Sequence, residues 1–334
     1  MAWSTSRPCP PPRPTRSPGC HASAVRRTDR HRPYERGPLT MTTLAFIGLG
    51  IMGSPMAVHL QNAGFDVVGF NRSPEKTAPL VEAGGRAAGS VAEAVAGADI
   101  VAIMVPDSPD VAAVLREDGV LDHAAPGTLV IDFSSIRPDV ASELATEAQE
   151  KGLRMLDAPV SGGEPGAINA ALSIMVGGEA SDFATASEVF AAVGKTIVHV
   201  GPSGAGQTVK AANQLIVAVN IEALAEALVF LEAYGVDLPA AVEVLGGGLA
   251  GSAVLNQKAG KMLERAFEPG FRIDLHHKDL GIVTAAAREA GVATPAAALL
   301  AQLMGSARAN GDGGLDHSAL YRGVARLSGV DHER

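Results

Sequence analysis

Hydrophobic residues are concentrated between Gly201 and Gly235, where a glycine-broken turn is followed by about seven turns of uninterrupted helical sequence. Apolar side chains cover most of the circumference of this segment, which is typical of a helix that packs on several sides. A membrane span is the alternative interpretation, but Asn220, Glu222 and Glu226 interrupt the apolar run, and carboxylates inside a membrane are costly. We therefore expect a long helix buried between two folded bodies.

Upstream of this helix, short apolar segments of strand length alternate with segments of helical periodicity. Strands are expected at residues 42–47, 66–70, 100–104, 129–132, 155–160, 173–176 and 197–200. Helices are expected between them at residues 54–63, 75–83, 90–96, 109–115 and 181–193. Such alternation predicts a parallel sheet covered by helices.

Downstream of the long helix no convincing strand pattern returns. Helical periodicity is found at residues 239–245, 254–261, 279–290, 295–310 and 318–328. The predicted fold class is therefore α/β, with a Rossmann-type dinucleotide-binding domain over residues 41–203 and an all-α domain over 204–328, joined by the long shared helix.

A glycine motif lies at the first strand-to-helix junction, in the order Gly48-Leu49-Gly50-Ile51-Met52-Gly53. A GxGxxG motif alone is weak evidence, but here it has a strand before it, a helix after it and a second strand that completes a βαβ unit. The glycines permit a tight turn, and the helix N-terminus offers N–H groups to a pyrophosphate. We predict that this turn binds a dinucleotide.

The end of the second strand bears on the choice between NAD and NADP. An acidic residue there would accept hydrogen bonds from the ribose 2′-hydroxyl, whereas an arginine accommodates a 2′-phosphate. The sequence has Asn71, Arg72 and Ser73 and no acid. We predict that NADP(H) is preferred and that NAD(H) remains possible, because Arg72 could be merely solvated and Asn71 could serve NADH.

Further candidate residues follow the other parallel strands, at the edge of the sheet where ligands bind in this architecture. Val105, Pro106 and Ser135 are expected to line the cofactor, although Pro106 and Ser135 could equally be ordinary turn residues.

The candidate chemistry lies where the long helix begins. Lys210 and Asn213 are three residues apart, so both project from one face of the helix, directly after a flexible glycine segment. A lysine on a helix is most often solvated, but this helix has little polar face. Upstream, Ser161, Gly162 and Gly163 expose several backbone N–H groups in a tight turn, which predicts a nest for a carboxylate.

Composition excludes several classes of protein. The formal charge is −9, and residues 1–40 alone carry eight arginines and two acids, or +6, which leaves −15 on the remainder. An acidic body does not suggest a nucleic-acid or membrane partner.

Cys9 and Cys20 both precede residue 41, so the folded part uses neither disulfides nor thiolate metal sites. The pair His276 and His277 does not favour a metal site, because adjacent helical residues point about 100° apart.

Residues 1–40 are rich in Pro, Arg and Ser and lack apolar periodicity, so we expect them to be disordered or a mis-assigned leader that precedes a start at Met41. No apolar segment of secretory length is evident, and the prolines argue against an amphipathic transit peptide. A cytoplasmic location is the expected default.

The glycine motif, the Ser-Gly-Gly turn, Lys210 with Asn213, and the run Lys278-Asp279-Leu280 occur in an order that resembles the β-hydroxyacid dehydrogenase family over residues 44–328. The segments DAPVSGGEP from Asp157, GGLAGS from Gly247 and PGFRIDLHHKDL from Pro269 resemble the branch that reduces tartronate semialdehyde to D-glycerate.

The resemblance implies a role for each matching residue. Lys210 would be the catalytic proton donor and acceptor, and Lys278 would contact the cofactor near the nicotinamide. The substrate would be a small carboxylate-bearing aldehyde or alcohol, held by Ser161, Gly162, Gly163 and Asn213. The cofactor would be lined by Ile51, Met52 and Ser135. The resemblance also implies homodimers or homotetramers.

Three other functions remain open from the sequence. The same residues suit the oxidation of 3-hydroxyisobutyrate or another β-hydroxyacid, which differs only in pocket shape. An imine reductase is less favoured, since that branch lacks the lysine. A non-catalytic NADP-binding scaffold would have no need of a proton donor at Lys210.

Overall fold

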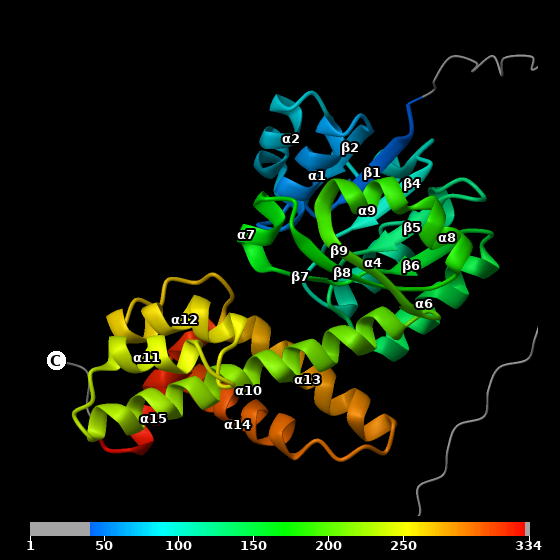
Figure 1. Cartoon of the computed structure of the whole chain (residues 1–334). Helices are drawn as coiled ribbons and strands as arrows, with labels where there is room; N and C mark the ends of the chain where they lie inside the picture. The colour runs from blue at the N-terminus through cyan, green and yellow to red at the C-terminus, as the bar shows by residue number, and fades with distance from the viewer. Residues whose placement is uncertain (1–40, 331–334) are drawn as a thin grey trace, which may run out of the picture. The chain divides into compact units, whose positions relative to one another are not determined.

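The computed structural model describes residues 41–330, so the expectation for residues 1–40 lies outside the described part of the chain. Figure 1 shows a strand-and-helix part that leads through one long helix into a part made only of helices. This is the predicted α/β class with a helical C-terminal part.

The sheet has nine strands, in the order β3-β2-β1-β4-β5-β6-β8-β7, with β9 paired to β8. Six of them form a parallel array: β1 (Thr43–Ile47), β2 (Asp66–Phe70), β3 (Arg86–Ala87), β4 (Ile100–Ile103), β5 (Leu129–Asp132) and β6 (Arg154–Asp157). β4 and β5 are buried at every residue, as expected for parallel strands covered by helices on both faces. The array therefore brings the carboxyl ends of its strands to one edge.

The remaining strands are β7 (Val160–Ser161), β8 (Leu172–Gly177) and β9 (Gly194–Gly201). β8 runs antiparallel to β6 and β7 and parallel to β9. The single strand predicted over residues 155–160 is therefore wrong in detail, because the chain leaves β6 at Asp157 and pairs again only at Val160.

Two apolar layers cover the sheet. On one face α1 (Gly53–Asn62) and α9 (Ser187–Val193) pack with Phe46, Phe133 and Phe190. The other face is covered by α3 (Val91–Val95), α4 (Ser108–Arg116), α5 (Val120–His123) and α6 (Pro138–Glu150). Shorter segments complete this part: η1 (Pro74–Thr77), α2 (Ala78–Glu82), α7 (Gly163–Ile168) and α8 (Ala180–Thr185).

The helix α6 was not predicted from the sequence. It is mostly polar and buries only Ala141, Leu144 and Ala148, so its hydrophobic stripe is too thin to be read as a periodic signal. The single helix expected over residues 181–193 is instead two helices, α8 and α9, that meet at Ala186.

The helical part consists of α10 (Ala205–Ala233), α11 (Leu238–Gly246), α12 (Ala253–Glu264), α13 (Ile273–Glu289), α14 (Pro295–Ala309), η2 (His317–Ala319) and α15 (Leu320–Leu327). Its core joins Ile221 and Leu228 of α10 to Met262, Leu280 and Met304. Among the described residues, α10 alone is long and apolar enough to cross a membrane by length and composition. It packs on β8 and β9 at its start and on α12, α13, α14 and α15 further along, as a core helix does.

The loop before α13 is held by one buried carboxylate. Asp316 is fully buried and accepts hydrogen bonds from the backbone N–H groups of Gly270 and Phe271 at 2.9 and 3.1 Å. It also accepts from the Ser318 hydroxyl at 2.7 Å and pairs with the Lys258 ammonium at 3.0 Å. Burial alone would raise the pKa of Asp316, but its charged and hydrogen-bonding neighbours outweigh burial and hold the pKa below its usual value.

We expect Asp316→Asn to lower the free energy of unfolding by about 3–5 kcal/mol, because it leaves the Lys258 ammonium without its buried counter-charge. Since the folded pKa lies below the ordinary value of 3.8, the stabilisation is present above that pH and is lost as the pH falls through the folded pKa. Urea unfolding at neutral and acidic pH measures both effects.

Asp274→Asn is the matched control in the same domain. Asp274 pairs with Arg308 at 2.6 Å, but both side chains are more than 40% exposed, and exposed pairs contribute at most about 1 kcal/mol. Equal losses for the two variants would contradict the assigned role of Asp316.

Candidate active site

The glycine turn between β1 and α1 has the shape that a dinucleotide requires. Gly48 has a φ of +98°, and a Cβ there would lie 2.2 Å from the carbonyl oxygen of Met104. A Cβ on Gly53 would lie 1.9 Å from the carbonyl oxygen of Gly48, so both positions must lack a side chain. A Cβ on Gly50 would meet no atom within 4 Å. The middle glycine therefore borders open space, where a phosphate can approach the backbone.

The start of α1 is available to an anion. Its cap residue Met52 makes no side-chain capping hydrogen bond, so the first N–H groups of this ten-residue helix have no side-chain acceptor of their own. Ile51 beside it is 67% exposed. These features fit a pyrophosphate at the helix N-terminus.

Asn71 and Arg72, at the end of β2, point in opposite directions. Asn71 is turned inward: its Oδ1 accepts from the N–H of Leu49 at 2.9 Å, and its Nδ2 donates to the carbonyl oxygen of Ser73 at 3.1 Å. Arg72 is turned outward, with a side chain that is 77% exposed and paired with Asp110 at 2.9 Å. Asn71 thus stiffens the glycine turn, while the guanidinium of Arg72 remains accessible to a ligand.

Lys278 of α13 lies over the tips of two strands. Its ammonium donates to the carbonyl oxygens of Pro106 and Ser135, at 3.0 and 2.7 Å, and pairs with Asp279 at 3.0 Å. The N–H of Val105 is fixed in turn by the hydroxyl of Ser134 at 3.0 Å. The structure therefore brings together three residues that the sequence placed at this edge, and it joins them to the helical part through Lys278.

The Ser161 turn has the geometry of a backbone nest. Gly162 and Gly163 have φ values of +134° and +61°, which side chains rarely tolerate. The turn opens α7 with no side-chain cap, so its N–H groups are free of side-chain acceptors. Consecutive N–H groups in such a turn suit a carboxylate.

Lys210 lies in the second turn of α10 and is 92% buried, since its exposed fraction is 8%. Its Nζ donates to Oε1 of Gln214 at 3.0 Å, and Nδ2 of Asn213 donates to the same oxygen at 2.8 Å. Nε2 of Gln214 donates to Asp279. Lys210 and Asn213 therefore share one acceptor, the amide oxygen of Gln214, on the same side of α10.

Gln214 and Asp279 are functional candidates that the sequence analysis missed. Gln214 is four residues beyond Lys210, a spacing that places two helical side chains side by side, so the signal was present. Asp279 was expected in the first turn of a helix beginning there. That expectation is wrong, because α13 begins at Ile273 and Asp279 is 97% buried against Gln214 and Lys278.

The electrostatics of this cluster suit proton transfer. Burial lowers the pKa of Lys210 to about 8, with Asp279 opposing the shift and Lys278 reinforcing it. An amine with this pKa exchanges its proton close to neutral pH, which general acid–base catalysis requires.

The buried histidine of α13, His276, faces His317 of η2. His276 is fully buried, and its Nε2 lies 3.1 Å from the carbonyl oxygen of Gln214, so Nε2 is the donor. Its Nδ1 lies 3.0 Å from Nδ1 of His317, and burial lowers the pKa of both rings. Within residues 41–330, no group of three His, Cys, Asp or Glu side chains could hold a metal ion. His276 instead supports α10 next to the lysine.

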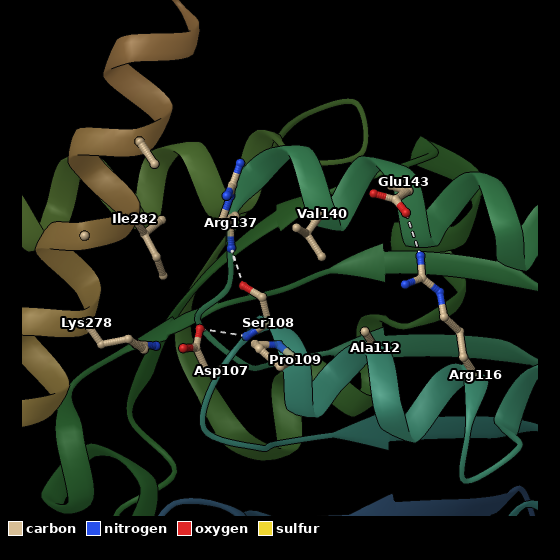
Figure 2. Close-up of a pocket in the computed structure, with 12 residues that line it drawn as sticks. Asp107, Ser108, Pro109, Ala112, Arg116, Arg137, Val140, Glu143, Lys278 and Ile282 are labelled. Carbon is tan, nitrogen blue, oxygen red and sulfur yellow. Dashed lines mark hydrogen bonds and ion pairs between the residues drawn. The ribbon is translucent and has the colours of Figure 1, made fainter.

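A groove of about 510 Å³ adjoins Lys278 on the side of α4 and α6 (Figure 2). Arg116, Arg137 and Glu143 lie along it, and α13 contributes Ile282 together with Lys278. Neither Lys210 nor the Ser161 turn lines this groove. The groove is therefore a different place from the cluster around Lys210, where the residues suited to proton transfer lie.

Known proteins resemble this chain over both its sheet-containing and its helical part. Residues 43–201 match the family described as the NAD binding domain of 6-phosphogluconate dehydrogenase, and residues 204–324 match the NAD-binding domain of NADP-dependent 3-hydroxyisobutyrate dehydrogenase. The chain is 42% identical over 286 residues to 2-hydroxy-3-oxopropionate reductase of Escherichia coli (strain K12), covering 85% of this chain and 98% of that protein.

Two other relatives carry different names. An NAD-dependent L-serine dehydrogenase of Pseudomonas aeruginosa is 41% identical over 271 residues, covering 79% of this chain and 91% of that protein. Among solved structures, 3-hydroxyisobutyrate dehydrogenase of Mycobacterium tuberculosis with L-serine matches with a TM-score of 0.79 and 35% identity, covering 85% of this chain and 99% of that chain. With the glycine turn, the helical C-terminal part and these relatives in agreement, the chain belongs to the β-hydroxyacid dehydrogenase family and is an NAD(P)-dependent oxidoreductase that acts on CH–OH groups.

Proposed function

We propose that this enzyme reduces tartronate semialdehyde (2-hydroxy-3-oxopropionate) to D-glycerate, reversibly, with Lys210 as proton donor and acceptor. The observation that carries the proposal is the buried Lys210 amine, with its pKa near 8 and its hydrogen bond to Gln214. The E. coli relative named 2-hydroxy-3-oxopropionate reductase supports this choice of substrate.

The chemistry divides between cofactor and protein. A bound reduced nicotinamide supplies the hydride that adds to the aldehyde carbon. As the carbonyl double bond opens, the oxygen gains negative charge, and the Lys210 ammonium stabilises that charge and gives it a proton. Gln214 takes one N–H of the ammonium and so leaves the others for the substrate. In the oxidation direction the neutral amine takes the hydroxyl proton instead.

The remaining residues hold the reactants. We assign the substrate carboxylate to the turn formed by Ser161, Gly162 and Gly163, which fixes the distance of the aldehyde from the hydride donor. Asn213 donates one amide N–H to Gln214, and we assign its remaining N–H and its carbonyl oxygen to orienting the substrate. Lys278 donates hydrogen bonds to the carbonyl oxygens of Pro106 and Ser135, and we assign it to the nicotinamide end of the cofactor site.

A second candidate is the oxidation of 3-hydroxyisobutyrate, L-serine or another β-hydroxyacid. It is favoured by relatives that carry these names and by the same lysine, since the chemistry is unchanged. A mere NADP-binding scaffold is not favoured, because a desolvated amine would serve it no purpose.

We further propose that the protein forms homodimers or homotetramers in the cytoplasm. Residues 41–203 bind the dinucleotide and contribute the Ser161 turn to the substrate site, and residues 204–328 supply the rest of that site and the association surface. An exposed apolar stripe runs along α10 through Val209, Ile216, Val219 and Phe230. The apolar helix α11 has no fully buried residue: Leu238, Val242 and Leu245 pack on the helical core, but Val244 is 76% exposed. Such unpartnered apolar surface suits a second copy better than water.

The substrate proposal predicts a higher kcat/KM for tartronate semialdehyde than for 3-hydroxyisobutyrate or L-serine, measured by the change in NAD(P)H absorbance.

Lys210→Ala should lower kcat about 10²- to 10⁴-fold, because general acid–base help is lost. Cofactor binding, followed by NADPH fluorescence, should be nearly unchanged. The exposed Lys195 provides the control substitution Lys195→Ala, which should leave kcat unaltered. An active Lys210→Ala enzyme would remove the lysine from the mechanism.

The pKa of Lys210 predicts opposite pH profiles for the two directions. Reduction needs the ammonium, so its kcat should fall as the pH rises through about 8, while oxidation needs the neutral amine, so its kcat should rise through the same pH. A transition near the ordinary lysine value of 10.5 would show that the amine is not desolvated during turnover.

The cofactor proposal predicts a preference for NADPH that depends on Arg72. Arg72→Ala should raise the KM for NADPH about 10- to 100-fold, as expected for a lost charged hydrogen bond, and leave kinetics with NADH unchanged. Arg86→Ala is the control, since Arg86 is also an exposed arginine paired with an aspartate. A wild-type enzyme that strongly prefers NADH would overturn the assignment.

A further inference from the structure

We propose that Asp157 is the positioning residue for Lys210: its carboxylate fixes the first turn of α10 against the sheet and so determines where the amine lies. The inference rests on the proposed role of Lys210. It concerns a residue at the end of β6 that touches neither substrate nor cofactor in that proposal.

The start of α10 lacks a cap of its own. Gly204 precedes the helix with a φ of +88° and no side chain to accept the first N–H groups. Asp157 supplies the missing acceptor from the sheet: its Oδ1 accepts from the N–H of Gly204 at 2.7 Å, and its Oδ2 from the N–H of Gln207 at 2.9 Å. A carboxylate at this end also meets the positive pole of a 29-residue helix. The contact is 98% buried at Asp157, so water does not compete for it.

The backbone around this carboxylate is packed as closely as glycine allows. A Cβ on Gly206 would lie 2.8 Å from Oδ2 of Asp157 and 2.3 Å from the carbonyl oxygen of Met175. A Cβ on Gly177 would lie 2.4 Å from Oδ1 of Asp157. The helix start, β6 and β8 therefore meet without intervening side chains, and α10 cannot move closer to the sheet at this point.

Gln207 extends the same anchor to the next strand. Its Oε1 accepts from the N–H of Ile136 at 3.0 Å, and its Nε2 donates to the carbonyl oxygen of Ser134 at 2.8 Å. The neighbouring carbonyl, that of Ser135, is held by Lys278. The loop after β5 is thus hydrogen-bonded to Gln207 of α10 and to Lys278 of α13. Lys210 lies one turn beyond Gln207, so these contacts also fix where Lys210 lies.

A second carboxyl group faces the anchor. Asp132 of β5 is in register with Asp157 of β6, is fully buried and leaves its Oδ2 without a hydrogen-bond partner. Burial is the main cause that raises its pKa to about 7, and Asp157 adds to the shift while Lys278 opposes it. Burial also raises the pKa of Asp157, but both of its oxygens accept N–H groups, which is the arrangement of the ionised form. When Asp132 is protonated, Asp157 is the only negative charge of this pair.

The test is Asp157→Asn, which keeps the size of the side chain but turns one accepting oxygen into an NH₂ group facing an N–H. We expect kcat to fall about 10- to 100-fold, since small displacements of a catalytic group have effects of this size, while the KM for NADPH stays near the wild-type value. We also expect the transition in the kcat profile for oxidation to move from about 8 toward 10.5, because a loosened α10 lets water reach the amine. A merely structural role would lower the melting temperature without moving that transition.

Asp182→Asn is the matched control. Asp182 is also a buried aspartate bound to β6, but it pairs with Arg154 at the opposite end of that strand, at 3.0 Å. It should lower the melting temperature and leave the pH profile in place. Asp132→Asn removes the other group that titrates nearby, and the transition at about 8 should persist in it.

Gln207→Met is the second test if Asp157→Asn does not fold. It removes both hydrogen bonds of the amide to the loop after β5 without adding a charge near Lys210, and it should move kcat and the transition in the same direction. An unmoved transition in either folded variant would overturn the inference. If Lys210→Ala is inactive but Asp157→Asn keeps the wild-type pH profile, the inference about Asp157 is wrong and the proposed role of Lys210 stands. If the Lys210→Ala enzyme is active, the proposed role of Lys210 is wrong.

Discussion

The removal of one lysine amine from water is the constraint on which the rest of the site depends. An ammonium in bulk solvent neither gives up its proton near neutral pH nor stabilises an adjacent alkoxide strongly, because water screens it. Burial in the second turn of α10 lowers the pKa of this amine to about 8, which suits the proton-transfer role proposed for it. The cost of that burial is offset in part by the hydrogen bond to Gln214, which accounts for one of the buried polar residues in an otherwise apolar helix.

The partners of the amine come from both parts of the chain. Gln214 belongs to the same helix as Lys210, but it is oriented by Asp279 of α13, which also pairs with Lys278. Lys278 in turn holds the loops after β4 and β5. One carboxylate therefore balances two lysines that lie at the edge of the sheet. Charge balance and geometry are set by the same few contacts, so a change in one alters the other.

α10 fits this role because it belongs to two cores. Its first turns contact β8 and β9, and its later turns contact α13, α14 and α15. A helix with one apolar face could serve only one of these surroundings. The apolar circumference that makes this helix resemble a membrane span is thus the property that lets it join the sheet to the helical part.

Local sequence signals predicted much of the fold. The strands β1, β2, β4 and β5 were found because covered parallel strands are continuous apolar runs, and α10 was found because it is long and uninterrupted. The helix α6 was missed because alanine supplies much of its thin apolar stripe. The start of α13 was missed because its first turns bury polar side chains, which read as loop until their partners are known.

The sequence by itself determined the βαβ unit, the glycine turn, the long helix and the residue types at the site, since each of these is encoded within a few neighbouring residues. Only the tertiary structure decided that Asp279 orients the Gln214 amide beside Lys210, and that Asp157 holds the helix that carries the lysine. The physical reason is that buried polar residues are explained by partners remote in the chain. Asp279 lies 65 residues from Gln214, and Gln207 lies 50 residues from Asp157, distances over which sequence periodicity carries no information.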